Sequence, residues 1–198
     1  MLEQARGAFI AQCDGDDFWL DSKKLYKQVN FLSQHPEYVL SFHRAKRIYE
    51  KGFRNKEDRV EEGVYRDIPQ GNLRVLSTAY MLMGTVMHRN VGLDFPPEYY
   101  LAPNGDIFVP ILLGAHGGAK FQEEVGPLGQ RRHPRGAWSS KTLSQKLSMH
   151  FRTYLQIASY FVRMEEPKSV FRIAKNQLRQ VSVKYFTVHL NFDKESKD

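Results

Sequence analysis

The sequence predicts an α/β domain followed by a helical extension at its C-terminus. Up to about residue 138, short apolar runs that predict strands alternate with helix-forming stretches, and beyond it only amphipathic helical patterns follow. The 198 residues are enough for a sizeable core, and 41% hydrophobic with 26% charged residues is ordinary for a globular protein. We therefore expect residues 1–138 to form the α/β domain and 139–198 the extension.

The first elements surround an acidic cluster. Residues 8–11 form an apolar run that predicts a buried strand, and Asp21 is positioned to cap a helix of about a dozen residues that ends at Pro36. Residues 38–42 predict the next strand, and the charged, poorly periodic stretch 46–66 predicts a surface excursion. The expected apolar stripe of the helix consists of Leu25, Val29 and Leu32.

The second half begins with a predicted core strand within residues 79–88 and a helix after Asn104-Gly105-Asp106, in which Pro110 fits only near the first turn. Residues 120–125 predict a strand and 126–136 a loop. Ser139 or Ser140 is expected to cap a long helix, and Pro167 to open the last one. The residues expected inside these three helices are Ile107, Ile111, Leu112, Leu143, Leu147, Phe151, Leu155, Val170, Ala174, Leu178 and Val181.

Charge and cysteine usage bound the environment. A net charge of +7 and a pI near 9.4 favour polyanionic partners: phosphorylated small molecules, anionic lipid or nucleic acid. No sequence-specific nucleic-acid motif is present. The single cysteine, Cys13, suits a reducing compartment, and no apolar run approaches the ~20 residues that span a bilayer. We expect a cytoplasmic protein, with peripheral contact to the inner face of the membrane as an option.

The acidic cluster carries the first chemical signal. Asp14, Asp16 and Asp17 place three carboxylates within four residues directly after the first predicted strand. Like charges at this spacing repel one another unless a cation neutralises them, and oxygen ligands suit Mg²⁺ or Mn²⁺. Ligands of open α/β sheets also collect at the carboxyl ends of strands. The alternative interpretation of the cluster alone is a solvated turn.

Several ordered blocks resemble the family 2 glycosyltransferases. The main block runs Gly7-Ala8-Phe9-Ile10-Ala11-Gln12-Cys13-Asp14-Gly15-Asp16-Asp17-Phe18-Trp19, continuing through the Lys24-Leu25 and Gln28-Val29-Asn30-Phe31-Leu32 segments. Thr85 to Arg89, Asn104-Gly105-Asp106 and Arg131 to Ser139 resemble later blocks of the same family. The resemblance implies a GT-A fold, a Rossmann-like domain around a nucleotide-sugar and a divalent metal.

The resemblance also implies roles for individual residues. Asp14 and Asp16 would form the metal-binding Asp-x-Asp signature, with Asp14 also near the ribose, and His133 would complete the metal shell. Asp106 would be the base that deprotonates an acceptor hydroxyl in an inverting transfer. The residues that would contact the donor in the active-site loop are Arg131, Arg132 and Trp138. The expected donor is a UDP-sugar and the acceptor a saccharide or lipid-linked saccharide, as in bacterial surface-polysaccharide synthesis.

The pattern departs from the family at the N-terminus. Family members carry a base-binding strand and helix before the acidic cluster, whereas 13 residues precede Asp14 here. The sequence therefore resembles an N-terminally truncated family member, with its first strands missing.

Two other function classes compete with the transferase. A haloacid-dehalogenase-like phosphohydrolase also places Asp-x-Asp after an apolar strand, although Phe18 stands where Thr or Val is usual. The non-enzymatic alternative is an inactive basic module that binds membranes. Its basis is a cationic stripe at helical spacing: Lys168, Arg172, Lys175 and Arg179.

Overall fold

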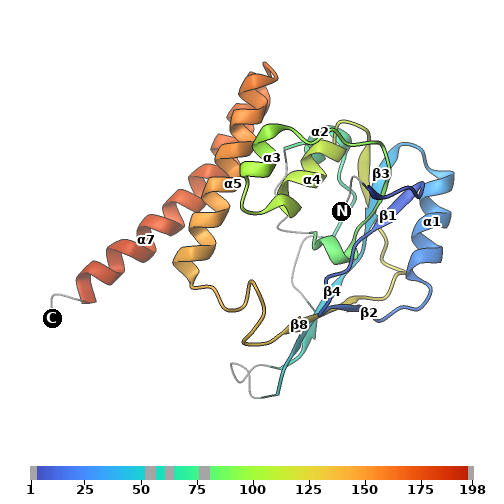
Figure 1. Cartoon of the computed structure of the whole chain (residues 1–198), viewed down its shortest axis with the longest axis horizontal. Coiled ribbons are helices and arrows are strands. Elements are labelled where there is room, and N and C mark those ends of the chain that lie inside the picture. Colours follow the sequence, from blue (N-terminus) through green and yellow to red (C-terminus); the bar gives the residue numbers. More distant parts are fainter. Residues whose placement is uncertain (1–3, 52–56, 61–64, 76–80, 196–198) are drawn as a thin grey trace. The chain divides into compact units, whose positions relative to one another are not determined.

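A computed structural model describes residues 4–51, 57–60, 65–75 and 81–195, with the side chains of 189–195 left out (Figure 1). The chain forms two compact units, each described by itself. Unit 1 comprises residues 1–93 and 110–139, and unit 2 comprises 94–109 and 140–198. The two-domain division of the chain at residues 138 and 139 stays a prediction.

Unit 1 is a mixed α/β unit with two four-stranded sheets. The first sheet has the order β1-β6-β3-β7 and contains β1 (Phe9–Ala11), β6 (Met87–Arg89), β3 (Tyr38–Phe42) and β7 (Gly118–Phe121). The second has the order β2-β8-β4-β5 and contains β2 (Phe18–Trp19), β8 (Leu128–Arg132), β4 (Ala45–Tyr49) and β5 (Arg59–Val60). Within each sheet one pair is parallel, β3 with β7 and β4 with β8, and the other pairs are antiparallel.

Short helical segments complete unit 1. They are α1 (Lys24–Gln34), α2 (Gln70–Leu73) and the 3-10 turn η3 (Met83–Thr85), and α4 (Gly105–Leu113) runs from unit 2 into unit 1. The strand at residues 38–42 and the helix ending before Pro36 confirm the predictions. Ile107, Ile111 and Leu112 are buried as predicted, but Pro110 lies inside α4 beyond its first turn.

Helix α1 buries a different face from the one predicted. Lys23, not Asp21, occupies the N-cap position, and Leu25 and Val29 are exposed. Of the predicted stripe only Leu32 is buried, and it shares its face with Lys24 and Gln28. Hydrophobicity alone could not predict this face because two of its three members are polar.

Four predictions about loops and strands are wrong in part. Residues 45–49 and 128–132 are strands rather than an excursion and a loop, because they pair with each other in parallel from Ala45↔Leu128 to Tyr49↔Arg132. The strand expected at 120–125 lies at Gly118–Phe121, and the core strand expected within residues 79–88 begins only at Met87 and continues to Arg89. Part of the latter prediction, residues 79 and 80, lies outside the described residues.

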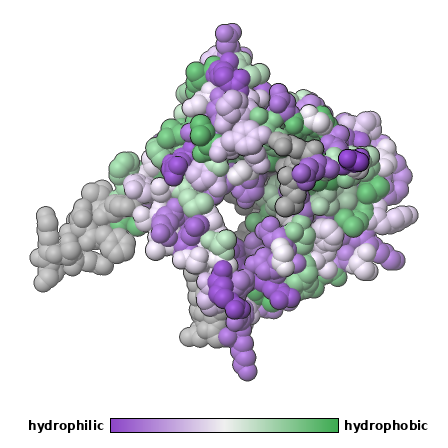
Figure 2. All heavy atoms as spheres, viewed as in Figure 1, coloured by the Kyte–Doolittle hydropathy of each residue, from purple (hydrophilic) through white to green (hydrophobic). Residues whose placement is uncertain are grey.

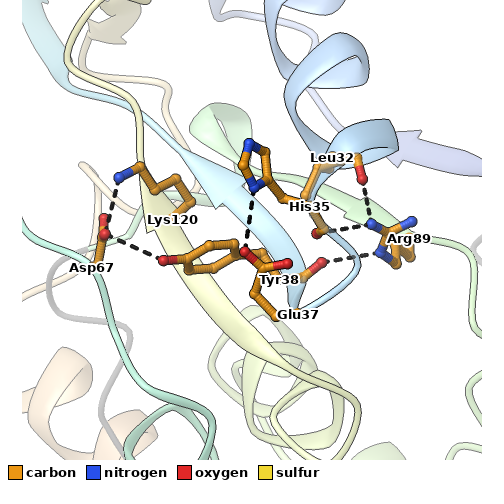
Figure 3. Close-up of polar contacts among 7 residues, drawn as sticks. All are labelled: Leu32, His35, Glu37, Tyr38, Asp67, Arg89 and Lys120. Atoms are coloured by element: carbon orange, nitrogen blue, oxygen red, sulfur yellow. Dashed lines mark hydrogen bonds and ion pairs between the residues drawn. The ribbon is translucent and has the colours of Figure 1, made fainter.

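Arg89 fixes the C-terminal end of α1 to the first sheet (Figure 3). Its guanidinium donates to the carbonyl oxygens of Leu32, His35 and Tyr38. On the other side of Tyr38, the Asp67 carboxylate accepts from Lys120 Nζ at 3.0 Å and from the Tyr38 hydroxyl at 3.5 Å. The Arg89 contacts hold the C-terminal end of α1 against β3.

Unit 2 is helical. It contains α3 (Pro97–Leu101), α5 (Leu143–Arg163), α6 (Pro167–Ile173), the π-helical segment η4 (Ala174–Leu178) and α7 (Arg179–Glu195). Thr142, not Ser139 or Ser140, caps α5 in a capping box with Gln145, whereas Pro167 opens α6 as predicted. Arg163 binds Glu98 through two hydrogen bonds of 2.8 and 3.0 Å, which ties α5 to α3.

The buried face of α5 also differs from the prediction. Leu147 is buried, but Leu143 and Leu155 are exposed. Residues spaced by four rotate about 40° per step around an α-helix, so a run of three such steps leaves the core-facing side. The buried residues follow a mixed spacing of three and four: Leu147, Thr153, Tyr154, Ile157, Tyr160 and Phe161. In the last helices Ala174 is exposed, and the buried residue is its neighbour Ile173.

Candidate functional site

The acidic loop lies between β1 and β2. It forms a tight turn in which the amide of Asp17 donates to the carbonyl oxygen of Asp14 at 3.0 Å. Asp14 and Asp16 are exposed, whereas Asp17 is half-buried. The Asp17 carboxylate accepts from the backbone amide of Arg131 at 2.9 Å. Asp17 thus anchors the loop to β8 and leaves Asp14 and Asp16 at the surface.

His133 meets this loop from the far end of the sequence. Its Nε2 lies 3.0 Å from the Asp16 carboxylate oxygen, although 117 positions separate the two residues. The side chain of Asp16 is 47% exposed and that of His133 20%, so a solute can reach both. Of the predicted metal ligands, the structure brings these two into contact.

The pairing of β2 with β8 explains why the two loops meet. Phe18 lies opposite Gly129 and Trp19 opposite Leu128, so the residues that flank the pair share one edge of the second sheet. A Cβ at Gly129 would lie 2.8 Å from the Phe18 ring, so a larger residue at this position would force the ring to shift. Trp19 adds a hydrogen bond of 2.9 Å from its indole to the carbonyl oxygen of Gly84.

The carboxylates of the loop differ in their protonation. The hydrogen bond from His133 lowers the pKa of Asp16, which keeps its carboxylate negatively charged. Burial raises the pKa of Asp17 to about 6, against the opposing effect of the Arg131 amide. Burial and the neighbouring carboxylates raise the pKa of Cys13, so its thiol stays protonated at neutral pH.

The fit of this site to a divalent cation is partial. A carboxylate and an imidazole suit Mn²⁺, and an open site leaves positions for phosphate oxygens. Among the described residues, no group of three or more His, Cys, Asp or Glu side chains is arranged to hold a metal. His133 Nδ1 is buried and has no hydrogen-bond partner among them, whereas ligating histidines usually donate this proton.

The remaining predicted residues of the active-site loop differ in their exposure. Arg131 is exposed and its guanidinium lies over the Phe18 ring at 5.2 Å, while Arg132 and Trp138 are half-buried. The carbonyl oxygen of Arg132 accepts from the amide of Glu50, which extends the contact between β4 and β8. Of Arg131 and Arg132, Arg131 is therefore the one that is exposed to an anionic ligand.

Asp106 belongs to unit 2, at the start of α4. Its carboxylate accepts from the amide of Ile107 at 3.0 Å, and the preceding Asn104 amide donates to Thr153 Oγ1 at 3.1 Å. His150 lies one turn before Thr153 on α5. Burial lowers the pKa of His150, and the negative charge of the Asp106 carboxylate opposes that shift. The sequence analysis missed His150, although its position on the face of Thr153 and Ile157 was readable from the helical period.

A buried polar layer under α1 was also missed. Lys24 and Gln28 face Ser41 and His43 of the β3 end, and Gln28 Nε2 donates to the Ser41 oxygens and the Thr85 carbonyl at 3.1 to 3.2 Å. Lys24 is 1% exposed and its ammonium lies 4.3 Å from the centre of the Trp19 ring. Polar atoms of the layer without a hydrogen-bond partner among the described residues are Lys24 Nζ, Gln28 Oε1 and His43 Nε2.

Comparisons with known proteins extend over a short stretch. No family model matches the chain. Over 57 residues, 29% of this chain, it is 47% identical to the uncharacterized protein Rv1520 of Mycobacterium tuberculosis (strain ATCC 25618 / H37Rv) and to the uncharacterized protein Mb1547 of Mycobacterium bovis. The matched stretch spans 16% of the length of each relative.

Proposed function

We propose that this chain is part of a metal-dependent glycosyltransferase of the GT-A type, which transfers a sugar from a nucleotide-sugar to an acceptor hydroxyl with inversion. The observation that carries the proposal is the 3.0 Å contact between Asp16 and His133. Both were assigned to the metal site from separate sequence blocks, and the alternative interpretation of a solvated acidic turn gives no reason for the two blocks to meet. The mixed α/β fold of unit 1 is compatible with it.

In this proposal Asp16 and His133 hold Mn²⁺ or Mg²⁺, and Asp14 is exposed in the same turn as Asp16. The cation, when bound, supplies positive charge that stabilises the departing diphosphate. Arg131 adds a guanidinium that can bind phosphate oxygens in a bidentate manner. Asp17 keeps the acidic loop attached to β8 by accepting from the Arg131 amide, so the loop and Arg131 stay next to each other.

Asp106 is the proposed base. It lies at the N-terminus of α4, where the helix dipole favours negative charge, and its hydrogen bond from Ile107 orients the carboxylate. The half-buried His150 is the titratable neighbour of Asp106 on α5. A UDP-sugar as donor and a saccharide or lipid-linked saccharide as acceptor remain parts of the proposal that rest on the sequence resemblance.

Calorimetric titration of uridine diphosphate, with and without Mn²⁺, tests the proposal. We expect binding that requires Mn²⁺ and that weakens about tenfold or more in Asp16→Asn and in His133→Gln, since each variant removes one ligand. Asp58→Asn is the matched control: it changes an aspartate of the β4–β5 region and keeps the oxygen that accepts from the Tyr49 amide.

Two results would overturn the proposal. One comes from the titration: uridine diphosphate binds equally well without Mn²⁺, or it does not bind to wild-type chain that circular dichroism shows to be folded. The other is hydrolysis of p-nitrophenyl phosphate that is lost in Asp14→Asn, because it would assign the acidic loop to a phosphohydrolase instead.

A further inference from the structure

The last helices carry an outward face that no described residue covers. From Phe171 to Thr187, the exposed positions other than Ala174 fall into two neighbouring rows spaced by four and then three residues. Phe171 is 64% exposed, Val183 58% and Phe186 61%. We define the outer face by the residues of these two rows: Phe171, Lys175, Arg179, Val183 and Phe186 in one, and Asn176, Gln180, Lys184 and Thr187 in the other.

The residues of this face differ from those of the cationic stripe that the sequence predicts. The sequence alone predicts a purely cationic stripe that includes Arg172, but Arg172 is half-buried in the structure. Aromatic and cationic side chains instead lie side by side: the Lys175 ammonium is 5.8 Å from the centre of the Phe171 ring. In Figure 2 the visible part of these helices shows hydrophobic and hydrophilic residues intermixed. The face is therefore neither a fully solvated charged surface nor a continuous apolar one.

The charge around the face has one sign. Between Pro167 and Phe192 the chain has five lysine and arginine residues and no aspartate or glutamate. No helix within the described ranges, α6 and α7 included, is long and apolar enough to cross a bilayer. Cations next to isolated aromatic side chains are typical of helices that lie in the interface of a membrane.

We propose that the outer face of α6–α7 docks onto an anionic lipid surface, with Phe171, Val183 and Phe186 inserted between headgroups and Lys175, Arg179 and Lys184 against lipid phosphates. Anionic lipid matches the uniform positive charge, and the bilayer boundary accepts the separated apolar side chains without a complementary protein groove. An acidic protein partner would match the charge but would need a pocket for each of the apolar side chains. The inference is independent of the transferase proposal, because it uses residues of unit 2 alone.

Cosedimentation of the chain with vesicles tests the docking. We expect binding to phosphatidylcholine vesicles that contain phosphatidylserine, much weaker binding to pure phosphatidylcholine, and loss of binding at high salt. Lys175→Gln/Arg179→Gln should weaken binding about 25-fold, at about fivefold for each cation lost. Phe171→Ser/Phe186→Ser should weaken binding at high salt as well, because insertion of the rings is not electrostatic.

The controls carry the same changes on exposed residues of unit 1. Lys51→Gln/Arg59→Gln removes the same charge from the protein, and Leu25→Ser/Tyr26→Ser removes exposed apolar side chains of α1. Both should bind like wild type. Equal losses in the controls, or equal binding to both kinds of vesicle, would overturn the proposal. Sedimentation velocity provides a further check: self-association that Phe171→Ser/Phe186→Ser abolishes, without any binding to vesicles, would assign the face to a second copy of this chain.

Discussion

Two polar clusters of unit 1 lie on either side of β2 and are solvated in opposite ways. The Asp16–His133 pair is exposed, and its two members satisfy each other at 3.0 Å. The layer of Lys24, Gln28 and His43 is buried, and it has polar atoms without partners among the described residues. Exposed pairs can exchange one partner for a ligand at little cost, whereas buried groups affect stability through their protonation. The first cluster is therefore the candidate for binding, and the second for pH-dependent stability.

The largest effect that we expect concerns His43. Burial lowers the pKa of His43 to about 4 in the folded chain, from an ordinary value of 6.5. Between these two pH values the unfolded chain binds a proton at His43 and the folded chain does not. Stability is then lost as the pH falls from 6.5 to 4, by about 3 kcal/mol in total. Urea unfolding of His43→Gln should show a smaller loss over this range than wild type. The exposed His35→Gln is the control, and a wild-type profile that His43→Gln leaves unchanged would contradict the prediction.

Lys24 should act over an alkaline range. Burial lowers its pKa to about 8 from 10.5, so the unfolded chain binds more protons between these values and stability rises with pH through this window. Lys24→Met removes the penalty that is present below pH 8, and we expect an increase of about 1 to 3 kcal/mol in the free energy of unfolding at pH 7. Lys23→Met changes the exposed neighbour and should have little effect. Destabilisation by Lys24→Met would show that the ammonium has a partner that stabilises it.

Gln28 tests the hydrogen bonds of the same layer. Its amide donates to Ser41 and to the Thr85 carbonyl, so Gln28→Leu leaves buried acceptors without that donor. We expect a loss of about 1 to 3 kcal/mol at all pH values. Chemical denaturation at pH 5, 7 and 9 measures it, beside the exposed substitution Asn30→Leu on the same helix. A loss that varies with pH like that of His43 would mean that the layer titrates as one unit.

The smallest effect on stability belongs to the exposed pair. Asp16→Asn without metal should change the free energy of unfolding by about 0 to 1 kcal/mol, as for other exposed ion pairs, although the same variant should lose metal-dependent binding. Thermal unfolding with and without Mn²⁺ separates the two effects. A loss above 2 kcal/mol without metal would make the pair a structural contact and break the contrast with the buried layer.

Local pattern predicted the elements whose signals lie within a few residues. The strand at residues 38–42, the end of α1 before Pro36 and the start of α6 at Pro167 agree with the prediction. Patterns failed where polar residues are buried, as with Lys24 and Gln28 of α1. They also failed where a charged stretch pairs with a distant strand, as β4 does with β8.

At the candidate site, too, local sequence predicted the residues but not their long-range contacts. Sequence resemblance selected Asp14, Asp16 and His133 as ligands, but their contacts depend on strand pairing across more than a hundred positions. The polar layer under α1 escaped prediction, because neither residue type nor local spacing shows which side chains a distant element will bury. His150 beside Asp106 was missed although the helical period places it on the face of Thr153 and Ile157.

The sequence by itself determined the end of α1 before Pro36, the start of α6 at Pro167, the strand at residues 38–42, the acidic cluster and the acid-free cationic stretch at the C-terminus. Proline geometry, periodicity and charge are local properties, so each is present before the chain folds. Only the tertiary structure decided that β4 pairs with β8, that Asp16 meets His133 and that Phe171 lies beside Lys175 on an open face. Those outcomes depend on how distant segments share the buried space, and one segment alone does not contain that information.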